Sequence, residues 1–277
     1  MHKFSLVSQN SMASFIFTLI FVKQNSQKIN AIYCFQIVSG EKISSKLRNL
    51  NRLISNSSIK FALYKLAETH VFINLLNILK TITNLKYSSI KDIANAHNIP
   101  YFQFQDVNDK NFITHINNQK GNQFAVFTTG QIVRKSTLKE FKNYPINCHG
   151  SLLPEMRGPA QYIWYHLKNY EYYGITFNNL QYELDSGDIL YQNKFKIPKN
   201  ISCFYLHYLI AQKWGTEFKN LNNSLKFPPD SIKQTNLNSS TVSLPDADAF
   251  KQLKTRNIKV IKLSDFSKII SDIRKLN

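Results

Sequence analysis

Short apolar segments with strand character alternate with helical segments along the first 150 residues, and this alternation constrains the fold more than any other feature. The strand-like segments are rich in Val, Ile, Tyr and Phe. Strand–helix alternation is typical of a parallel sheet with crossover helices. We therefore predict an α/β fold with a Rossmann-like, mostly parallel sheet flanked by helices. The expected strands are residues 3–7, 31–38, 101–104, 123–128 and 145–149, the expected helices are 12–22, 88–97, 111–117 and 136–142, and a polar turn is expected at 8–11.

A helical stretch at about residues 41–83 interrupts this alternation. It begins with basic and polar residues and continues with apolar residues at helical spacing. The sequence therefore predicts a helical insertion between two sheet elements. Two interpretations stay open, a helical hairpin that packs on its own domain and a lid that faces an acceptor or a membrane. The residues at helical spacing are Tyr64, Ala67, Val71, Leu75 and Leu79.

Targeting and metal-binding signals are weak in this chain. The apolar stretch at residues 12–22 is shorter than the roughly 20 residues that a membrane-spanning helix needs, and no small-residue cleavage site follows it. The three cysteines, Cys34, Cys148 and Cys203, are too few and too scattered for a disulfide framework or a zinc site. We expect a cytoplasmic protein without a transmembrane segment and without a metal, while contact with a membrane surface stays open.

The formal net charge of +18 leaves two interpretations. Only six of the 35 basic residues are arginine, the residue best suited to bidentate phosphate and base contacts. A lysine-rich surface that is simply solvated explains this balance. An anionic partner, such as a nucleotide-linked substrate, an RNA or a membrane face, is the alternative.

The placement of glycine and of polar residues predicts the position of the functional site. Five of the eight glycines fall between residues 130 and 187, where loops would have to turn tightly around a ligand. In the strand expected at 145–149, Asn147 and His149 are two positions apart and share one face. The loop around Asp185 and Asp188 adds carboxylates. An amide, an imidazole and a carboxylate suit acyl transfer, although an Asn-x-His pair also occurs as a structural pair.

The ordered motifs of this region resemble the signature of the folate-dependent formyltransferases. This group includes the methionyl-tRNA, glycinamide ribonucleotide and sugar-nucleotide formyltransferases. The resemblance is close over residues 124–197 and looser over residues 1–200. The motifs are Asn147-x-His149-x-Ser151-Leu152-Leu153-Pro154, Arg157-Gly158, Gly174-Ile175-Thr176 and Leu184-Asp185-Ser186-Gly187-Asp188-Ile189-Leu190.

The resemblance implies a catalytic triad of Asn147, His149 and Asp185 and the co-substrate 10-formyltetrahydrofolate. Asn147 would stabilise the oxyanion when an amine attacks the formyl carbon, and His149 and Asp185 would move the proton. The implied folate contacts are Thr128, Thr129, Gly130, Gln131, Ile132, Val133, Leu184 and Gly187. The implied supporting residues are Ser151, Pro154, Arg157, Gly158 and Thr176.

The acceptor is predicted from features outside the triad. The turn at residues 8–11 lacks the glycine-rich phosphate loop of the glycinamide ribonucleotide enzymes. We expect a catalytic domain at residues 1–200 and a small C-terminal extension at 201–277, shorter than the β-barrel of the methionyl-tRNA enzymes. The favoured acceptor is therefore a small amine, on a nucleotide- or lipid-linked amino sugar or similar metabolite. A methionyl-tRNA formyltransferase and a non-catalytic nucleic-acid-binding module are the alternatives.

The chain departs from the family pattern at three places, and none of them removes a residue of the implied triad. We expect these departures to bear on the acceptor. They are Glu155-Met156, Pro159-Ala160-Gln161 and Phe177-Asn178.

Overall fold

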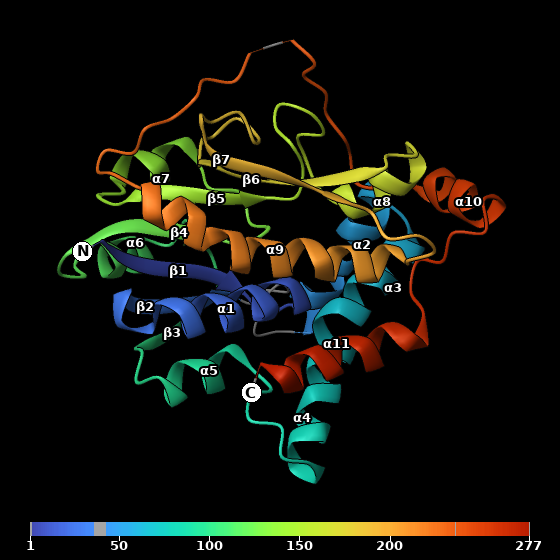
Figure 1. Ribbon diagram of the computed structural model, residues 1–277, viewed down its shortest axis with the longest axis horizontal. Coiled ribbons are helices and arrows are strands. Elements are labelled where there is room, and N and C mark those ends of the chain that lie inside the picture. The colour runs from blue at the N-terminus through green and yellow to red at the C-terminus, as the bar shows by residue number, and fades with distance from the viewer. Residues whose placement is uncertain (1, 36–42, 236, 277) are drawn as a thin grey trace.

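A single mixed sheet forms the centre of the molecule (Figure 1). The computed structural model describes residues 2–35, 43–235 and 237–276. Within these residues the strand order is β3-β2-β1-β4-β5-β6-β7. The first five strands of this order are parallel, and β6 is antiparallel to both of its neighbours, β5 and β7. This confirms the predicted fold class. The strands are β1 (Lys3–Gln9), β2 (Ile29–Phe35), β3 (Tyr101–Phe104), β4 (Asn122–Phe127), β5 (Tyr144–His149), β6 (Tyr172–Asn179) and β7 (Ile189–Lys196).

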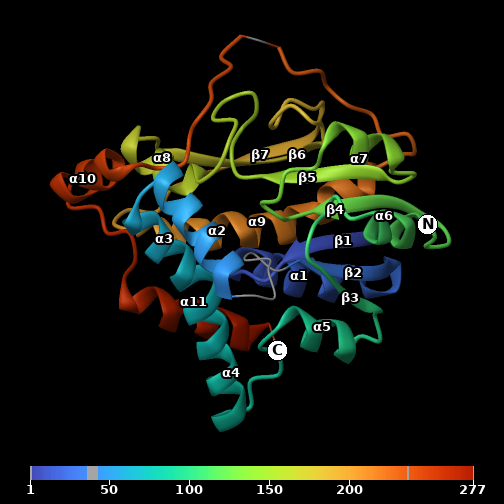
Figure 2. The same cartoon turned by 180° about the vertical axis from the view of Figure 1, so that it is seen from behind.

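Helices cover both faces of the sheet because its central strands are apolar on both sides. On β4, Phe124 and Val126 join the larger core, beneath α1 and α9, whereas Ala125 and Phe127 join a smaller core on the opposite face. Figures 1 and 2 show these two sides. The helices outside the insertion are α1 (Met12–Asn25), α5 (Ile90–Ala96), α6 (Lys110–Asn117), α7 (Lys135–Glu140), α8 (Gln161–Leu167), α9 (Cys203–Ser224), α10 (Ala247–Thr255) and α11 (Leu263–Lys275), with a 3₁₀ turn η1 (Ser26–Lys28).

The first strand runs two residues further than predicted. Gln9 still pairs with Phe35 of β2, so that the turn expected at residues 8–11 shrinks to Asn10 and Ser11. Ser11 caps the next helix, since its side chain accepts a hydrogen bond from the backbone of Ser14. The part of the strand expected at residues 36–38 lies outside the described residues.

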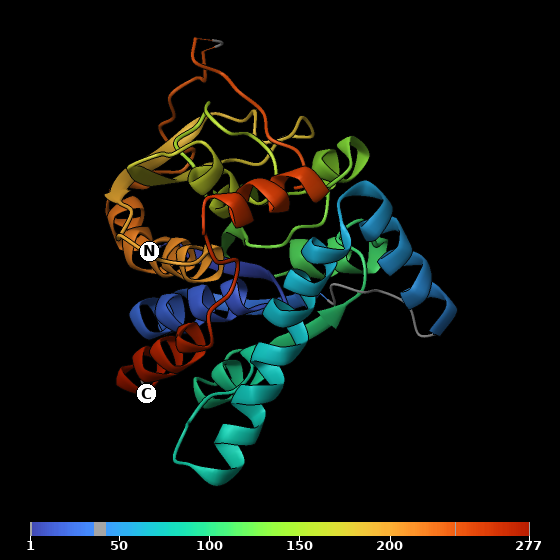
Figure 3. The same ribbon diagram turned by 90° about the vertical axis from the view of Figure 1, so that its right-hand side faces the viewer.

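The expected insertion is helical and lies beyond the carboxyl ends of the parallel strands (Figure 2). Its far end projects from the body of the molecule, as Figure 3 shows for α4. It therefore stands beside the edge of the sheet at which an α/β protein binds its ligands. The insertion consists of α2 (Ile43–Asn56), α3 (Ile59–Leu66), the π turn η2 (Ala67–Val71) and α4 (Phe72–Ile82).

The buried face of the insertion differs from the predicted stripe. Tyr64 is buried as expected, but Val71 is 53% exposed, and Phe72 and Leu76 are buried instead. The π turn η2 is the physical reason. Its wider turn shifts the inward-facing position by one residue, and helical spacing in the sequence does not reveal such a shift.

The C-terminal part of the chain packs against the sheet layer. Helix α9 lies so close to α1 that a Cβ atom on Gly215 would approach Ile20 Cβ to 2.7 Å. Between α9 and α10 the chain runs across the top of the molecule in Figure 1; we call the described residues between 225 and 246 the strap. No helix in the described parts of the chain is long and apolar enough to cross a membrane. The division at residue 200 stays a prediction.

Candidate active site

Asn147 and His149 meet at one carboxylate oxygen. Asn147 Nδ2 donates a hydrogen bond to Asp185 Oδ1 at 3.0 Å, and His149 Nδ1 lies 3.3 Å from the same atom. The two residues alternate with Cys148 at the end of β5, so a strand's two-residue period places them on one side. The structure therefore brings together the three residues of the predicted triad.

The Asp185 carboxylate is held from several directions. Its second oxygen, Oδ2, accepts the backbone N–H of Gly158 at 2.8 Å. Burial by itself raises the pKa of the Asp185 carboxyl. The imidazole of His149 and the hydrogen bonds from Gly158 and Asn147 outweigh burial and lower that pKa below its ordinary value. Asp185 is therefore ionised at neutral pH and can balance a positive charge on His149.

The second ring nitrogen of His149 has a partner for either protonation state. His149 Nε2 lies 3.1 Å from the carbonyl oxygen of Met156, which can only accept a hydrogen bond. It also lies 3.4 Å from Nε2 of Gln161, an amide that can donate one. The imidazole ring of His149 is buried. The backbone carbonyl of His149 accepts a hydrogen bond from the indole N–H of Trp214 at 2.9 Å. This arrangement suits a histidine that takes up and releases a proton at Nε2.

Asn178 fixes the orientation of the Asn147 amide. Asn147 Nδ2 donates to Asn178 Oδ1 at 3.2 Å, in addition to its bond with Asp185. Asn178 is fully buried and donates its own amide group to the carbonyl of Asn179 at 3.1 Å, so its oxygen is directed at Asn147. Both amide hydrogens of Asn147 are therefore engaged.

A cavity of about 400 Å³ opens above these residues, and we call it the triad cavity. Loops that follow β4 and β5 form one side, and the connection between β6 and β7 forms the other. The predicted residues that line it are Asn147, His149, Asp185, Thr129, Gly130, Gln131, Ile132, Val133, Leu184 and Gly158.

Two predicted folate contacts support the walls instead of lining the triad cavity. The backbone of Thr128 bonds to Val7 through its N–H and to the Ser14 hydroxyl through its carbonyl. Gly187 packs against the carbonyl oxygen of Asn179. A Cβ atom added to Gly187 would lie only 1.8 Å from that oxygen. Both residues hold backbone in place, and only glycine fits at position 187.

The predicted supporting residues stabilise the loop that follows β5. Ser151 donates its hydroxyl to the carbonyl of Glu155 at 2.6 Å, and Thr176 donates to the carbonyl of Ser151 at 2.6 Å. The carbonyl of Pro154 accepts the backbone N–H of Ser240 in the strap at 3.2 Å. Thr176 and Ser240 therefore hold the loop from two sides.

The strap also reaches Asp185. Gln234 donates its amide group to the backbone carbonyls of Asp185 at 2.8 Å and Gly187 at 2.7 Å. Its oxygen accepts Nη2 of Arg157 at 2.6 Å and Nε at 3.1 Å. One strap side chain thus joins the loop of Arg157 to the loop of Asp185.

The sequence prediction missed several residues that line the triad cavity. Gln161 lies three residues after Gly158, in one of the departures from the family pattern, and that departure was its only signal. Trp214 comes from α9, where no nearby motif marks it, and Leu244 comes from the strap. In the described parts of the chain, no group of three or more His, Cys, Asp or Glu residues could hold a metal ion. The remaining lining residues are Phe127, Cys148, Gly150, Pro159, Leu180, Gln181 and Tyr182.

The family model described as formyl transferase matches residues 76–206 of this chain. The match covers β3 to β7 and the whole predicted triad. It confirms the resemblance to the formyltransferases that the motifs predict.

Curated relatives of this chain include methionyl-tRNA formyltransferases. That of Clostridium perfringens (strain SM101 / Type A) is 33% identical over 132 residues, which are 47% of this chain and 43% of the relative. That of Clostridium tetani (strain Massachusetts / E88) is 30% identical over 180 residues, which are 63% of this chain and 58% of the relative. The chain therefore spans less than half the length of the first of these relatives.

Solved structures with the same fold come from other branches of the group. WlaRD, a sugar 3N-formyl transferase solved in the presence of dTDP and 5-N-formyl-THF, has a TM-score of 0.53 at 20% identity, over 88% of this chain and 70% of that one. The phosphoribosylglycinamide formyltransferase of Anaplasma phagocytophilum has a TM-score of 0.53 at 14% identity, over 82% of this chain and 90% of that one. These likenesses show the formyltransferase fold.

Proposed function

We propose that this chain transfers the formyl group of 10-formyltetrahydrofolate to a primary amine of a small acceptor. The observation that carries the proposal is the meeting of Asn147 and His149 at one oxygen of Asp185, on the wall of the triad cavity. The match of residues 76–206 to the formyl transferase model supports the reaction class.

The triad cavity suits the pterin end of a folate. Ile132, Val133, Leu180 and Leu184 offer apolar surface to a flat ring. The edge of the ring would take its hydrogen-bond partners from the few polar groups beside this surface. The sugar formyltransferases with this fold were solved with 5-N-formyl-THF and with folinic acid, which supports a folate as the co-substrate here. The bound folate would supply the formyl group.

Asn147 would stabilise the formyl oxygen as negative charge builds on it. Because both amide hydrogens of Asn147 are already engaged, one of its bonds must be exchanged for the formyl oxygen. The bond to Asn178, at 3.2 Å, is longer than the bond to Asp185, at 3.0 Å. Hydrogen bonds at catalytic sites commonly rearrange in this way when substrate binds.

His149 would carry the proton that the attacking amine loses. Its Nε2 accepts that proton and then bonds to the carbonyl of Met156, while the ionised Asp185 balances the positive ring through Nδ1. Returning the proton to the departing folate nitrogen restores the neutral ring, whose Nε2 can again accept a hydrogen bond from Gln161. Proton transfer by a positioned side chain typically contributes a factor of about 10² to 10⁴.

The acceptor that we propose is an amine on a nucleotide- or lipid-linked amino sugar or a similar metabolite. The test is an acceptor screen with 10-formyltetrahydrofolate, in which release of tetrahydrofolate is followed for amino sugars, ornithine derivatives and charged initiator tRNA. We expect release with a small amine, and release slower by roughly 10² or more with the His149→Ala variant. A chain that forms no formylated product with any amine contradicts the proposal.

Methionyl-tRNA is the second candidate acceptor, because the curated relatives are methionyl-tRNA formyltransferases. Residues 251–275 carry eight lysines and arginines against two aspartates, and tRNA phosphates would bind there. Binding of tRNA should then weaken with salt by about 0.7–0.9 log units per phosphate contact for each tenfold rise in concentration. The same segment, residues 251–275, also packs on the rest of the protein, because it buries three isoleucines in the larger core: Ile269, Ile270 and Ile273. Submicromolar binding near physiological salt, lost in a chain that ends before Lys251, would favour tRNA.

A further inference from the structure

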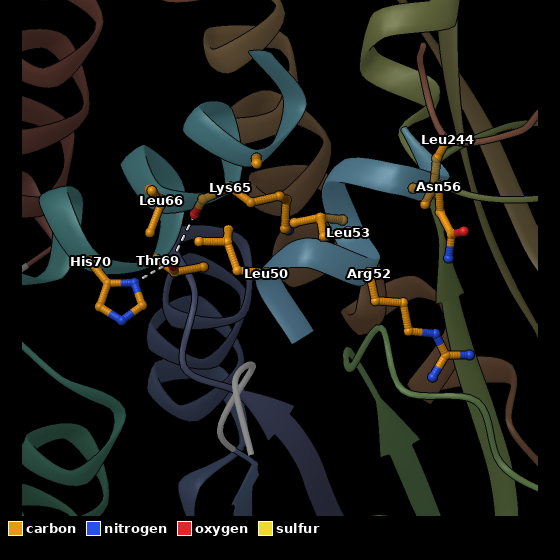
Figure 4. A pocket seen from close by; sticks show the side chains of 10 residues that line it. Leu50, Arg52, Leu53, Asn56, Lys65, Leu66, Thr69, His70 and Leu244 are labelled. Carbon is orange, nitrogen blue, oxygen red and sulfur yellow. Dashed lines mark hydrogen bonds between the residues drawn. The ribbon is translucent and has the colours of Figure 1, made fainter. Parts of the chain in front are cut away.

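A second pocket lies between helix α2 and helix α3 with its π turn η2; we call it the insertion pocket (Figure 4). Its volume is about 310 Å³. Figure 4 shows Leu66, Thr69 and His70 on one side of it and Asn56 and Leu244 on the other. The full lining is Leu50, Arg52, Leu53, Asn56, Ala62, Lys65, Leu66, Thr69, His70 and Leu244.

The insertion pocket is lined mainly by aliphatic side chains. Leucines from α2, α3 and the strap form its walls, and none of its lining residues is Phe, Tyr or Trp. A nucleobase is usually held by stacking on an aromatic ring, and the one ring in this lining is the imidazole of His70, on one side of the pocket, against four leucines. An alkyl or acyl chain needs only apolar surface. The lining therefore favours an aliphatic chain over a base.

The charges around the pocket are positive. Arg52 and Lys65 line it, and no lining residue is acidic. The carboxylate that pairs with Lys65 belongs to Glu68, which is fully buried and lies 3.8 Å from Nδ1 of His207. Arg52 lies on the exposed side of α2, so its guanidinium can meet an anionic head group in water.

One residue connects the insertion pocket with the triad cavity. Leu244 of the strap lines both. The strap is fixed on either side of it, since Trp164 Nε1 donates to the carbonyl of Ser243 at 2.9 Å and the Ser58 hydroxyl donates to the carbonyl of Pro245 at 3.4 Å. The two cavities therefore adjoin at the side chain of Leu244, whose neighbours in the strap are anchored through their backbone carbonyls.

We infer that the insertion pocket binds the aliphatic chain of a phosphorylated lipid, and that the formyl acceptor is the amine on its head group. The chain would lie among Leu50, Leu53 and Leu66, with its phosphate at Arg52. The head group would pass Leu244 into the triad cavity. The identification of the lipid as the acceptor rests on the proposed formyl transfer; the binding of the chain and phosphate does not.

The test is calorimetric titration of the whole chain, without folate, with hexyl, octyl and decyl phosphate below their micelle concentrations. We expect the affinity to rise by roughly three- to fourfold per methylene, the increment for burying one CH₂ group. We also expect dTDP, the nucleotide probe, to bind more weakly than decyl phosphate.

Matched variants locate the binding. Leu66→Asn should weaken decyl phosphate at least tenfold, whereas Leu63→Asn, on the same helix, 59% exposed and outside the lining, should leave it unchanged. Arg52→Gln should weaken the binding of decyl phosphate and leave the binding of decanol unchanged. Lys60→Gln is the control, since Lys60 is exposed and outside the lining, and it should change the binding of neither compound. Unchanged thermal unfolding of each variant verifies its fold.

Affinity without chain-length dependence, equal losses for Leu66→Asn and Leu63→Asn, or tighter binding of dTDP would overturn the inference. If decyl phosphate binds as expected but no amine is formylated, the proposed function fails and the lipid subsite stands. If a nucleotide-linked amine is formylated while decyl phosphate does not bind, the lipid subsite fails and the proposed function stands.

Discussion

His149 Nδ1 lies 3.3 Å from Oδ1 of Asp185, an aspartate whose backbone φ of 52° is in the left-handed region. A non-glycine residue in that region costs of order 1 kcal/mol or more and is kept where the surrounding contacts enforce it. Here the backbone N–H of Gly158 and the amide of Asn147 bind the carboxylate, and Gln234 binds the backbone carbonyl. Contacts from β5, from the loop that follows it and from the strap therefore hold Asp185 in place, with its carboxylate against the imidazole.

Replacing Asn147 or His149 by alanine should lower formyl transfer by roughly 10² or more, the typical cost of losing an oxyanion donor or a general base. Folate affinity should change little, because neither side chain is needed to hold the pterin. Single-turnover transfer, together with binding of 5-formyltetrahydrofolate, separates the two effects. Near-normal turnover of either variant with its true acceptor contradicts the assignment.

Asp185→Asn should keep the fold and lose most of the activity, because an amide cannot balance a protonated imidazole. Asp188→Asn is the matched control. Among the described residues, the Asp188 carboxylate accepts a hydrogen bond only from the Ser231 hydroxyl, at 3.4 Å. The backbone carbonyl of Asp188 accepts the backbone N–H of Asn179, and the substitution leaves that bond in place. The kcat of the two variants is compared at constant folate. A larger loss for Asp188→Asn would reverse the two roles.

Gln234→Ala should lower kcat by about tenfold, since two hydrogen bonds of about 1 kcal/mol each would be lost from the loop that carries Asp185. Lys233→Ala is the control, because Lys233 is exposed and adjacent in the strap. Gln234→Glu tests the same contact, since a carboxylate cannot donate to the carbonyls of Asp185 and Gly187 but can still bind Arg157. If Gln234→Ala retains full kcat, the strap does not position Asp185.

The stability of the protein should fall between pH 7 and pH 5 because of His207. Burial lowers the pKa of His207 to about 4; the nearby Glu68 carboxylate raises it and the Lys65 ammonium lowers it, by smaller amounts. The unfolded chain therefore binds a proton, at an ordinary pKa near 6.5, that the folded chain does not bind. The contribution of neutral, buried His207 to the free energy of unfolding is complete above pH 6.5, and it is lost as the pH falls toward 4.

We expect a loss of roughly 1–2 kcal/mol between pH 7 and pH 5, at about 1.4 kcal/mol per pKa unit. Urea unfolding at a series of pH values measures it. His207→Phe keeps a ring that can stack on Tyr162, as the imidazole does at 4.0 Å between centroids, and it should flatten the pH dependence. An unchanged slope in that variant would mean that another group titrates.

Local patterns in the sequence were sufficient for the sheet and for part of the site. Alternating side chains on a strand have a period of two, so Asn147 and His149 had to share a face once β5 was recognised. The strands and helices between Asn98 and His149 were predicted to within a few residues for the same reason, because each depends on neighbours a few positions away. The family motifs added Asp185, which no local period could have joined to the pair.

Helical periodicity failed to predict the buried face of the insertion. The π turn η2 moved Val71 to the surface, and the sequence gives no periodic sign of it.

The sequence by itself determined the α/β sheet and the three chemical groups of the candidate site. Only the tertiary structure decided how they are held and what lies beside them. Trp214, Gln234 and Leu244 reach the site from α9 and the strap, at least 29 residues after Asp185, the last residue of the predicted triad. Such contacts form only when the whole chain closes around its core, and no short-range propensity encodes which loop a strap side chain will meet.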